Sequence, residues 1–232
     1  MTTHPNLTIS GHPILAHKLS ILRSSQTPPS QFRSLLREIT YNLGYESTRD
    51  LKTKQIPVST PMEETKGVKL LDTVALIPIM RAGLSMVDPM LDLIPEADVH
   101  HIGMYRSKGS LLPVQYYNKL PRDKSADVAY VLDPMIATSG TICAVLNILK
   151  KWGATKIHVI SVLASQKGLE ILFASHPDVY VTVIAVDPVL KDGMIVPGLG
   201  DAGDRLYKTS TEGQDDDEKL CSPSKRKRTM ST

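Results

Sequence analysis

The stretch Val128–Thr141 reads V-A-Y-V-L-D-P-M-I-A-T-S-G-T, and the fold prediction starts from it. Its first five residues, Val128–Leu132, are the apolar side chains of a buried strand. The strand runs directly into the carboxylate of Asp133, and a short loop of small and hydroxyl-bearing residues then leads into a helical pattern. Strand, loop and helix form the repeating unit of a parallel α/β sheet, in which ligands bind beyond the carboxyl ends of the strands. We therefore expect a ligand site at Asp133 and the loop after it.

The same alternation continues on both sides of this stretch. Because the predicted strands are almost continuously apolar, both faces of the sheet must be covered. The sequence thus predicts an α/β fold, a parallel sheet covered by helices. The strands are expected at Thr73–Ile79, Val99–Met104, Val128–Leu132, Lys156–Leu163 and Val179–Val186, and the helices at Leu84–Leu93, Thr141–Trp152 and Gln166–Ser175.

An N-terminal helical segment precedes the alternation. Pro13–Leu22 has an amphipathic pattern, and a second helix is expected to start with Ser30 as its N-cap and to stop at Gly44. Apolar residues recur on one face of this second helix. The following segment, Leu51–Thr65, is polar and interrupted by proline, which predicts irregular structure or an edge strand.

The alternation lapses once, and it ends before the C-terminus. Tyr105–Asp127 is too long for an ordinary connection in a compact domain, so we expect a hairpin arm or a lid there. From Thr209 the chain is polar, with acidic and basic runs, and lacks the apolar residues that offset the entropy of ordering. The predicted organisation is one domain over residues 1–208, which includes the 105–127 arm, and a disordered charged tail over 209–232.

Composition excludes several classes of function. The 232 residues carry a net charge of only +3, which does not indicate nucleic-acid binding. No apolar stretch approaches the length of a membrane span, and no signal sequence is evident at the N-terminus. Two cysteines without zinc spacing favour a reducing, cytoplasmic location. The basic run Lys225–Arg228 matches a nuclear localisation signal and equally matches a solvated charged tail.

The loop Ala137–Thr141 has the chemistry of a phosphate site. It leads into a helix N-terminus, where unpaired N–H groups and the positive end of the dipole favour an anion, and the hydroxyls of Thr138, Ser139 and Thr141 can donate further hydrogen bonds. The upstream carboxylate of Asp133 suits sugar hydroxyls or a metal instead. A sugar phosphate satisfies both demands, and a simple capped turn is an equally good interpretation of this segment alone.

Two further strand ends carry arginines. Ile77–Leu84 reads I-P-I-M-R-A-G-L, which puts Arg81 at a strand tip before a small Ala-Gly pair. Gly103–Arg106 reads G-M-Y-R and puts Arg106 at the next tip. An arginine fork binds two oxygens of a pyrophosphate well, and an isolated arginine at a turn is more often a solvated surface residue.

The segment Ile195–Arg205, I-V-P-G-L-G-D-A-G-D-R, contains a formal G-x-G-x-x-G pattern. A dinucleotide fingerprint should follow the first strand of a βαβ unit, whereas this segment lies at the end of the predicted domain. We interpret it as a glycine-rich loop that offers backbone groups to a planar ligand.

Together these segments resemble the uracil phosphoribosyltransferases, a family with the type I phosphoribosyltransferase fold. D-P-M-x-A-T resembles their motif for 5-phosphoribosyl-1-pyrophosphate (PRPP), R-A-G their pyrophosphate loop, and P-G-L-G-D-A-G-D their uracil-binding signature. The resemblance runs from His12 to Tyr207 and includes the N-terminal H-P-I-L-A-H-K-L-S-I-L-R. Two departures are Pro134, where most type I enzymes have a second acid, and Ser139, where a glycine is expected; if that position needs a positive φ, serine is strained there.

The resemblance implies the site residues. It assigns PRPP binding to the two arginines, the loop and one acid: Arg81, Arg106, Asp133, Pro134, Met135, Ile136, Ala137, Thr138, Ser139, Gly140, Thr141 and Asp201. Uracil binding falls to Ile195, Gly200, Asp201 and Ala202. Asp133, Arg81 and Asp201 are implied as the catalytic residues.

The implied reaction joins uracil and PRPP to give UMP and pyrophosphate, as in pyrimidine salvage. The implied cofactor is Mg²⁺, held through PRPP with Asp201 as the one protein candidate. A homodimer or homotetramer and a GTP effector are also implied, with neither nucleic acid nor membrane as a partner. The alternatives are a non-catalytic PRPP or nucleotide sensor of the same fold, which Ser139 leaves open, and a phosphoribosyltransferase for another base.

Overall fold

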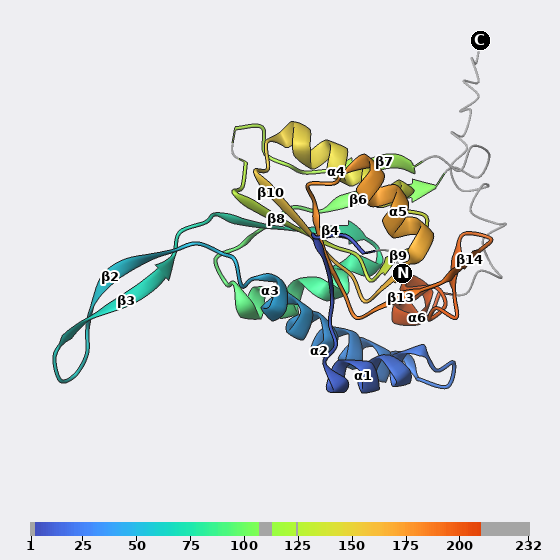
Figure 1. Ribbon diagram of the computed structural model, residues 1–232, viewed down its shortest axis with the longest axis horizontal. Helices are drawn as coiled ribbons and strands as arrows, with labels where there is room; N and C mark the ends of the chain where they lie inside the picture. The colour runs from blue at the N-terminus through green and yellow to red at the C-terminus, as the bar shows by residue number, and fades with distance from the viewer. Residues whose placement is uncertain (1–2, 107–112, 124, 210–232) are drawn as a thin grey trace, which may run out of the picture.

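The computed structural model describes residues 3–106, 113–123 and 125–209, without the side chain of Arg106 (Figure 1). The predicted α/β fold is confirmed: an eight-stranded sheet lies at the centre, and its pairs are parallel except for the last. The strand order is β1 (Leu7–Ile9), β12 (Tyr180–Val183), β10 (Lys156–Ile160), β8 (Val128–Leu132), β4 (Val74–Met80), β6 (Ile102–Arg106) and β7 (Pro113–Asn118), with β5 (Asp98–Val99) also paired to β4.

Helices cover both faces of the sheet, as the apolar strands predicted (Figure 1). Alternate residues of one strand enter different cores: Leu76 of β4 packs into the first core and Ile77 into the second. The first core includes residues from α1 (Pro13–Arg23), α2 (Pro29–Ser47) and α3 (Val87–Leu93), and the second includes residues from α4 (Gly140–Trp152) and α5 (Gln166–Ser175).

The predicted ends of α2 were wrong. The helix starts at Pro29, because proline fits the first turn without needing its missing N–H, and Ser30 is therefore inside the helix instead of capping it. Gly44 does not stop the helix, which continues to Ser47. A Cβ at Gly44 would lie 2.3 Å from the sulfur of Met90, so this glycine allows α2 to pack closely on α3.

Three of the predicted strands are each divided in two. Lys156–Leu163 becomes β10 and β11 (Leu163–Ser165), Val179–Val186 becomes β12 and β13 (Ala185–Asp187), and Val99–Met104 is divided between β5 and β6. β11 and β13 leave the central sheet and form a smaller parallel sheet with β9 (Met135–Ile136). Pro134 lies where the chain passes from the central sheet to the smaller one. It has no N–H for the hydrogen bonds of a sheet, and its carbonyl accepts hydrogen bonds from the N–H groups of Val162 and Leu163.

The helix predicted at Leu84–Leu93 is also divided. A 3₁₀ turn, η1 (Ala82–Met86), precedes α3, which begins at Val87. Pro89 lies in the first turn of α3, where its missing N–H costs nothing, and it would break an α-helix that began at Leu84.

Two hairpins extend the fold. Of the two alternatives predicted for Leu51–Thr65, irregular structure is wrong and strand structure is confirmed: β2 (Thr53–Ser59) and β3 (Glu64–Leu70) form an antiparallel ribbon that projects from the body (Figure 1). The excursion at Tyr105–Asp127 contains β7, which pairs antiparallel with β6, so its described part is a hairpin. Residues 107–112, the tail beyond Thr209 and the basic run Lys225–Arg228 lie outside the described residues. Within the described ranges, no helix combines the length and apolar character that a membrane crossing needs.

His158, the central residue of β10, is a buried titratable group. Its ring stacks on Tyr180 at 4.8 Å between centroids and lies 5.2 Å from that of Tyr130. Neither ring nitrogen has a hydrogen-bond partner among the described residues. Burial lowers the pKa of His158 to about 4, against the opposing effect of the Asp50 carboxylate. The folded protein therefore holds this imidazole neutral at pH values where an unfolded chain would protonate it.

We predict that His158 weakens the fold in acid. The unfolded chain gains a proton near pH 6.5 and the folded chain only near pH 4, so the free energy of unfolding should fall across this window by about 3 kcal/mol. The variant His158→Phe keeps the ring stacking and carries no proton. Urea unfolding of both proteins from pH 7.5 to 4.5 measures the difference, and parallel curves would show that His158 makes no such contribution.

Candidate active site

The register of the central strands brings two of the predicted site residues to one edge. Pro78 of β4 pairs with Leu132 of β8, so Arg81 and Asp133 both follow directly beyond adjacent strand ends. Gly83 fixes how closely these ends approach, because a Cβ at this position would lie 2.2 Å from the Leu132 carbonyl oxygen. The glycine of the R-A-G triplet thus allows the Arg81 turn to pack against the strand that ends at Asp133.

The predicted phosphate loop leads into α4 as expected. Ser139 is the N-cap residue and has φ 62°, so the position does require the left-handed conformation for which glycine is suited. Its hydroxyl is buried and donates to the carbonyl of Gly168 at 2.6 Å. This hydrogen bond helps to offset the backbone strain, and it engages the hydroxyl that the sequence analysis had offered to a phosphate. The backbone N–H groups at the helix start are unaffected by the serine.

Side chains in the segment Pro134–Ala137, which leads into this loop, are buried or partly buried. Pro134 and Ile136 are buried, and Met135 and Ala137 are partly buried. Ile136 is completely enclosed in the second core, so any ligand contact at this residue must be made by its main chain. The segment therefore supplies a shaped backbone more than it supplies polar side chains.

The glycine-rich segment begins in the second strand of a hairpin that was not predicted from the sequence. β14 (Val189–Lys191) pairs antiparallel with β15 (Met194–Val196), and the turn residues Asp192 and Gly193 have positive φ. Asp-Gly between two short apolar runs is a strong hairpin signal, and it could have been recognised in the sequence. The segment then leads into the short helix α6 (Ala202–Tyr207), which is unlike the βαβ setting of a dinucleotide site.

Asp201 begins α6 as its N-cap. One carboxylate oxygen, Oδ1, accepts a hydrogen bond from the N–H of Asp204 at 2.9 Å. Ile195 and Ala202, two of the residues assigned to the base, are buried, whereas Gly200 is exposed and has φ 78°. The loop therefore presents mainly backbone to its surroundings.

Two adjoining cavities lie between these segments. The first, about 340 Å³, is lined by the glycine-rich segment together with Asp133 and Ala137. The second, about 210 Å³, is lined by residues that include Arg81 and Thr141. The cavities share four lining residues, so they are two parts of one depression. The shared residues are Ala82, Asp133, Asp201 and Gly203.

Arg81 has partners that the sequence analysis did not assign. Its guanidinium donates to Asp204 Oδ1 at 3.0 Å and to the hydroxyl of Thr209 at 3.0 Å. The hydroxyl of Tyr207 donates to the Arg81 carbonyl at 3.4 Å. In the sequence, the only sign of the contact between Arg81 and Asp204 is the second aspartate of D-A-G-D, which is Asp204. Spacing along the chain cannot show which arginine pairs with it. Arg106 is the last residue of β6, and its side chain is not among those described.

A larger cavity, about 410 Å³, lies at the amino ends of the strands beside Lys156 and Tyr180. It contains none of the predicted site residues, and its charged lining includes side chains already joined as ion pairs, Lys156 with Asp50 and Lys150 with Asp178. Parallel α/β sheets bind ligands at the carboxyl edge, so the depression at Asp133 is the better candidate for the active site.

A parallel sheet with a phosphate-type loop, an arginine and a backbone-lined pocket at its carboxyl edge defines the class of type I phosphoribosyltransferases. A family model described as uracil phosphoribosyltransferase matches residues 9–209. The chain belongs to the uracil phosphoribosyltransferase family.

Individual relatives agree with this assignment. The uracil phosphoribosyltransferase of Roseiflexus sp. (strain RS-1) is 49% identical over 202 residues, which cover 87% of this chain and 97% of the relative. That of Thermus thermophilus is 47% identical over 206 residues, covering 88% and 99%. Among solved structures, the AQ2163 protein from Aquifex aeolicus superposes with a TM-score of 0.83 at 33% identity, over 88% of this chain and 99% of that one.

We predict that Gly83→Ala destabilises the protein, because the new methyl group would overlap the Leu132 carbonyl. The free energy of unfolding should fall by about 1–3 kcal/mol, as for other overpacked sites. Gly11→Ala is the matched control, since nothing lies within 4 Å of a Cβ there. Urea unfolding at pH 7 compares the two, and equal stability of both variants would contradict the close approach.

Proposed function

We propose that this protein is a uracil phosphoribosyltransferase that joins uracil to PRPP and releases pyrophosphate, giving UMP. One observation carries the proposal: two adjoining cavities share the carboxylates of Asp133 and Asp201, and one has the cation Arg81 while the other has the glycine-rich backbone. A phosphorylated sugar in the cavity that contains Arg81 and a planar base in the cavity lined by the glycine-rich segment would meet at these carboxylates.

The pyrophosphate end of PRPP is assigned to Arg81. Its side chain is about half exposed and lies beyond the end of β4, where the guanidinium pairs with Asp204. Charge-assisted hydrogen bonds to pyrophosphate oxygens would stabilise the negative charge that develops as the leaving group departs. Asp204 is then the residue that orients Arg81 before substrate arrives. Arg106 keeps its predicted role at the neighbouring tip.

The 5′-phosphate is assigned to the start of α4. This helix spans 13 residues, so the unpaired N–H groups and dipole of its first turn favour an anion at Ser139–Thr141. Thr141 lines the same cavity as Arg81 and Asp133. The ribose hydroxyls would then lie near Asp133, whose carboxylate accepts hydrogen bonds and is repelled by both phosphate groups.

The base is assigned to Ile195, Gly200, Asp201 and Ala202. Uracil presents acceptor, donor and acceptor groups along one edge, and main-chain N–H and C=O groups can match that order. Holding N1 of uracil in line with the departing pyrophosphate provides catalysis by orientation, without a protein nucleophile.

Mg²⁺ fits this site as a partner of PRPP. Asp133 and Asp201 both line the shared depression, and the described residues contain no cluster of three or more His, Cys, Asp or Glu side chains. Two carboxylates suit an ion that keeps most of its ligands as water and phosphate oxygens. When bound, Mg²⁺ would neutralise charge on the pyrophosphate. A GTP effector and a dimeric or tetrameric assembly stay predictions from the family resemblance.

We predict UMP formation from uracil and PRPP, and the experiment is an assay with a panel of bases. Uracil should be converted at least about 100-fold more efficiently than cytosine, orotate, hypoxanthine or guanine, because a site that pairs with specific polar groups rejects bases that leave them unpaired. A preference for another base would show that the protein is a phosphoribosyltransferase for that base and not for uracil. PRPP binding without turnover would favour the sensor.

We predict that Arg81→Ala loses about 100-fold or more of kcat/KM while the fold survives, since it removes a charged donor to the leaving group and the side chain is half exposed. Arg37→Ala is the control, because Arg37 forms a similarly exposed ion pair, with Asp92. Steady-state kinetics and circular dichroism test both variants. Near-normal kinetics in Arg81→Ala would remove this residue from the site.

A further inference from the structure

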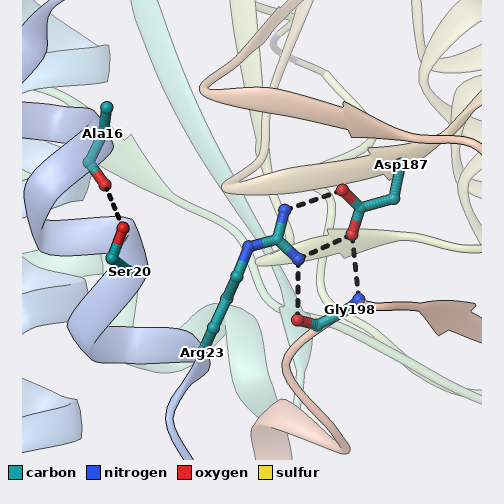
Figure 2. Close-up of polar contacts among 5 residues, drawn as sticks. All are labelled: Ala16, Ser20, Arg23, Asp187 and Gly198. Atoms are coloured by element: carbon teal, nitrogen blue, oxygen red, sulfur yellow. Dashed lines mark hydrogen bonds and ion pairs between the residues drawn. The ribbon is translucent and has the colours of Figure 1, made fainter.

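An ion pair outside the proposed site holds the glycine-rich loop (Figure 2). Arg23, the last residue of α1, donates from Nη1 to Asp187 Oδ2 and from Nη2 to Asp187 Oδ1, both at 2.7 Å. Gly198 completes the group: its carbonyl accepts from Arg23 Nη1 at 2.8 Å, and its N–H donates to Asp187 Oδ2 at 2.9 Å. The end of α1 is thus joined to two segments near the C-terminal end of the domain, at Asp187 and at the Gly198 turn.

The pair is largely removed from water. Asp187 is 4% exposed, and the Arg23 side chain is 23% exposed. Burial raises the pKa of Asp187, but the hydrogen bonds from Arg23 and Gly198 and the charge of Arg23 outweigh it, so the net pKa lies below its usual value. A partly buried, bidentate ion pair fixes the orientation of its members far better than a surface pair does.

A second arginine secures the same turn from the other side. Arg205 of α6 donates to the carbonyls of Leu22 at 2.6 Å, Leu199 at 2.8 Å and Ser24 at 2.5 Å, and its guanidinium lies 4.4 Å from the ring centre of Phe32. The carbonyls on either side of Arg23 therefore bind the helix that follows the loop. The end of α1 therefore both donates hydrogen bonds to the glycine-rich segment, through Arg23, and accepts hydrogen bonds from it, through the carbonyls that Arg205 contacts.

The loop needs these contacts from other segments because its own glycine residues have no side chains that could hold its backbone in place. Gly198 has φ 59°, and a Cβ there would lie 2.0 Å from the carbonyl oxygen of Ile195. Glycine permits this tight turn but brings no side chain that could hold it in place. Neighbouring groups therefore have to set the position of this backbone. A small displacement of a backbone that must match a ligand lowers affinity and activity.

We propose that Arg23 and Asp187 are positioning residues that set the backbone of the base-binding loop, and so determine the affinity and selectivity for uracil. The proposal rests on the proposed function, because it takes Ile195 and Gly200 as the groups that meet the base. It assigns the N-terminal helix α1 a part in base recognition without any contact with the substrate. PRPP affinity, which depends on the strand tips and on α4, should be independent of the pair.

The first test is Arg23→Lys, which keeps the charge but cannot reach both oxygens of Asp187 and the Gly198 carbonyl at once. At saturating PRPP, KM for uracil should rise by about 10-fold or more, while KM for PRPP stays within about two-fold. Lys150→Met, which breaks the exposed pair with Asp178, is the control and should leave both constants unchanged.

The second test separates positioning from simple stabilisation. The double variant Arg23→Met, Asp187→Leu removes both charges together, so neither side chain is left as an unpaired charge. It leaves the Gly198 N–H and carbonyl without these partners, so KM for uracil should remain raised even where urea unfolding equals that of the wild type. A purely structural pair predicts normal kinetics in a stable double variant, and that result would overturn the proposal.

The outcomes also distinguish this proposal from the function it rests on. A wild-type protein that forms no UMP would refute the proposed function itself. A wild type that turns over normally, with variants whose uracil KM is unchanged or rises only in parallel with PRPP KM, would refute the positioning role alone. Discrimination between uracil and cytosine, measured in the same variants, should fall with uracil affinity.

Discussion

Parallel pairing in register is the constraint on which the site depends. β8 and β10 end level with each other, since Leu132 pairs with Ile160, and β4 ends two residues beyond Pro78, which also pairs with Leu132. Everything that follows these strands therefore emerges at the same edge, where the turn at Arg81, the carboxylate of Asp133 and the start of α4 meet. Gly83 lets the first of these turns touch the second strand end. A shift of one residue in this register would invert the strand faces and separate the groups.

The chemistry of the edge comes mostly from the backbone. Apart from Arg81 and two carboxylates, the depression is lined largely by small or apolar residues and by the glycine-rich segment. Such a site suits a substrate that has anionic groups at both ends of a sugar and a flat, neutral base. The carboxylates line both cavities, and negative charge at this place favours hydroxyl groups or a cation over a bare anion.

Precision at a backbone-built site has to come from its surroundings. Ser139 tolerates a left-handed conformation while its hydroxyl binds Gly168, and the Gly198 turn is held by two guanidinium groups from different helices. In both cases a residue with positive φ is held by a hydrogen bond between a side chain and a main-chain carbonyl: Ser139 donates to Gly168, and Arg23, from a distant part of the chain, donates to Gly198. These buried polar contacts explain why the loops can approach a ligand without large side chains of their own.

By itself the sequence determined the layered α/β class, most of the central strands, and the segments that reach the carboxyl edge, because apolar periodicity and turn residues are local signals. It also indicated that a non-glycine residue at position 139 would be strained if φ were positive, which the structure confirms. It failed where a distant contact decides the outcome: Gly44 is a packing position against Met90, and the long strands change sheet beside Pro134. Only the tertiary structure showed that Arg81 meets Asp204 and that Arg23 meets Asp187, because a side chain's partner depends on which segments the fold brings together and not on their spacing along the chain.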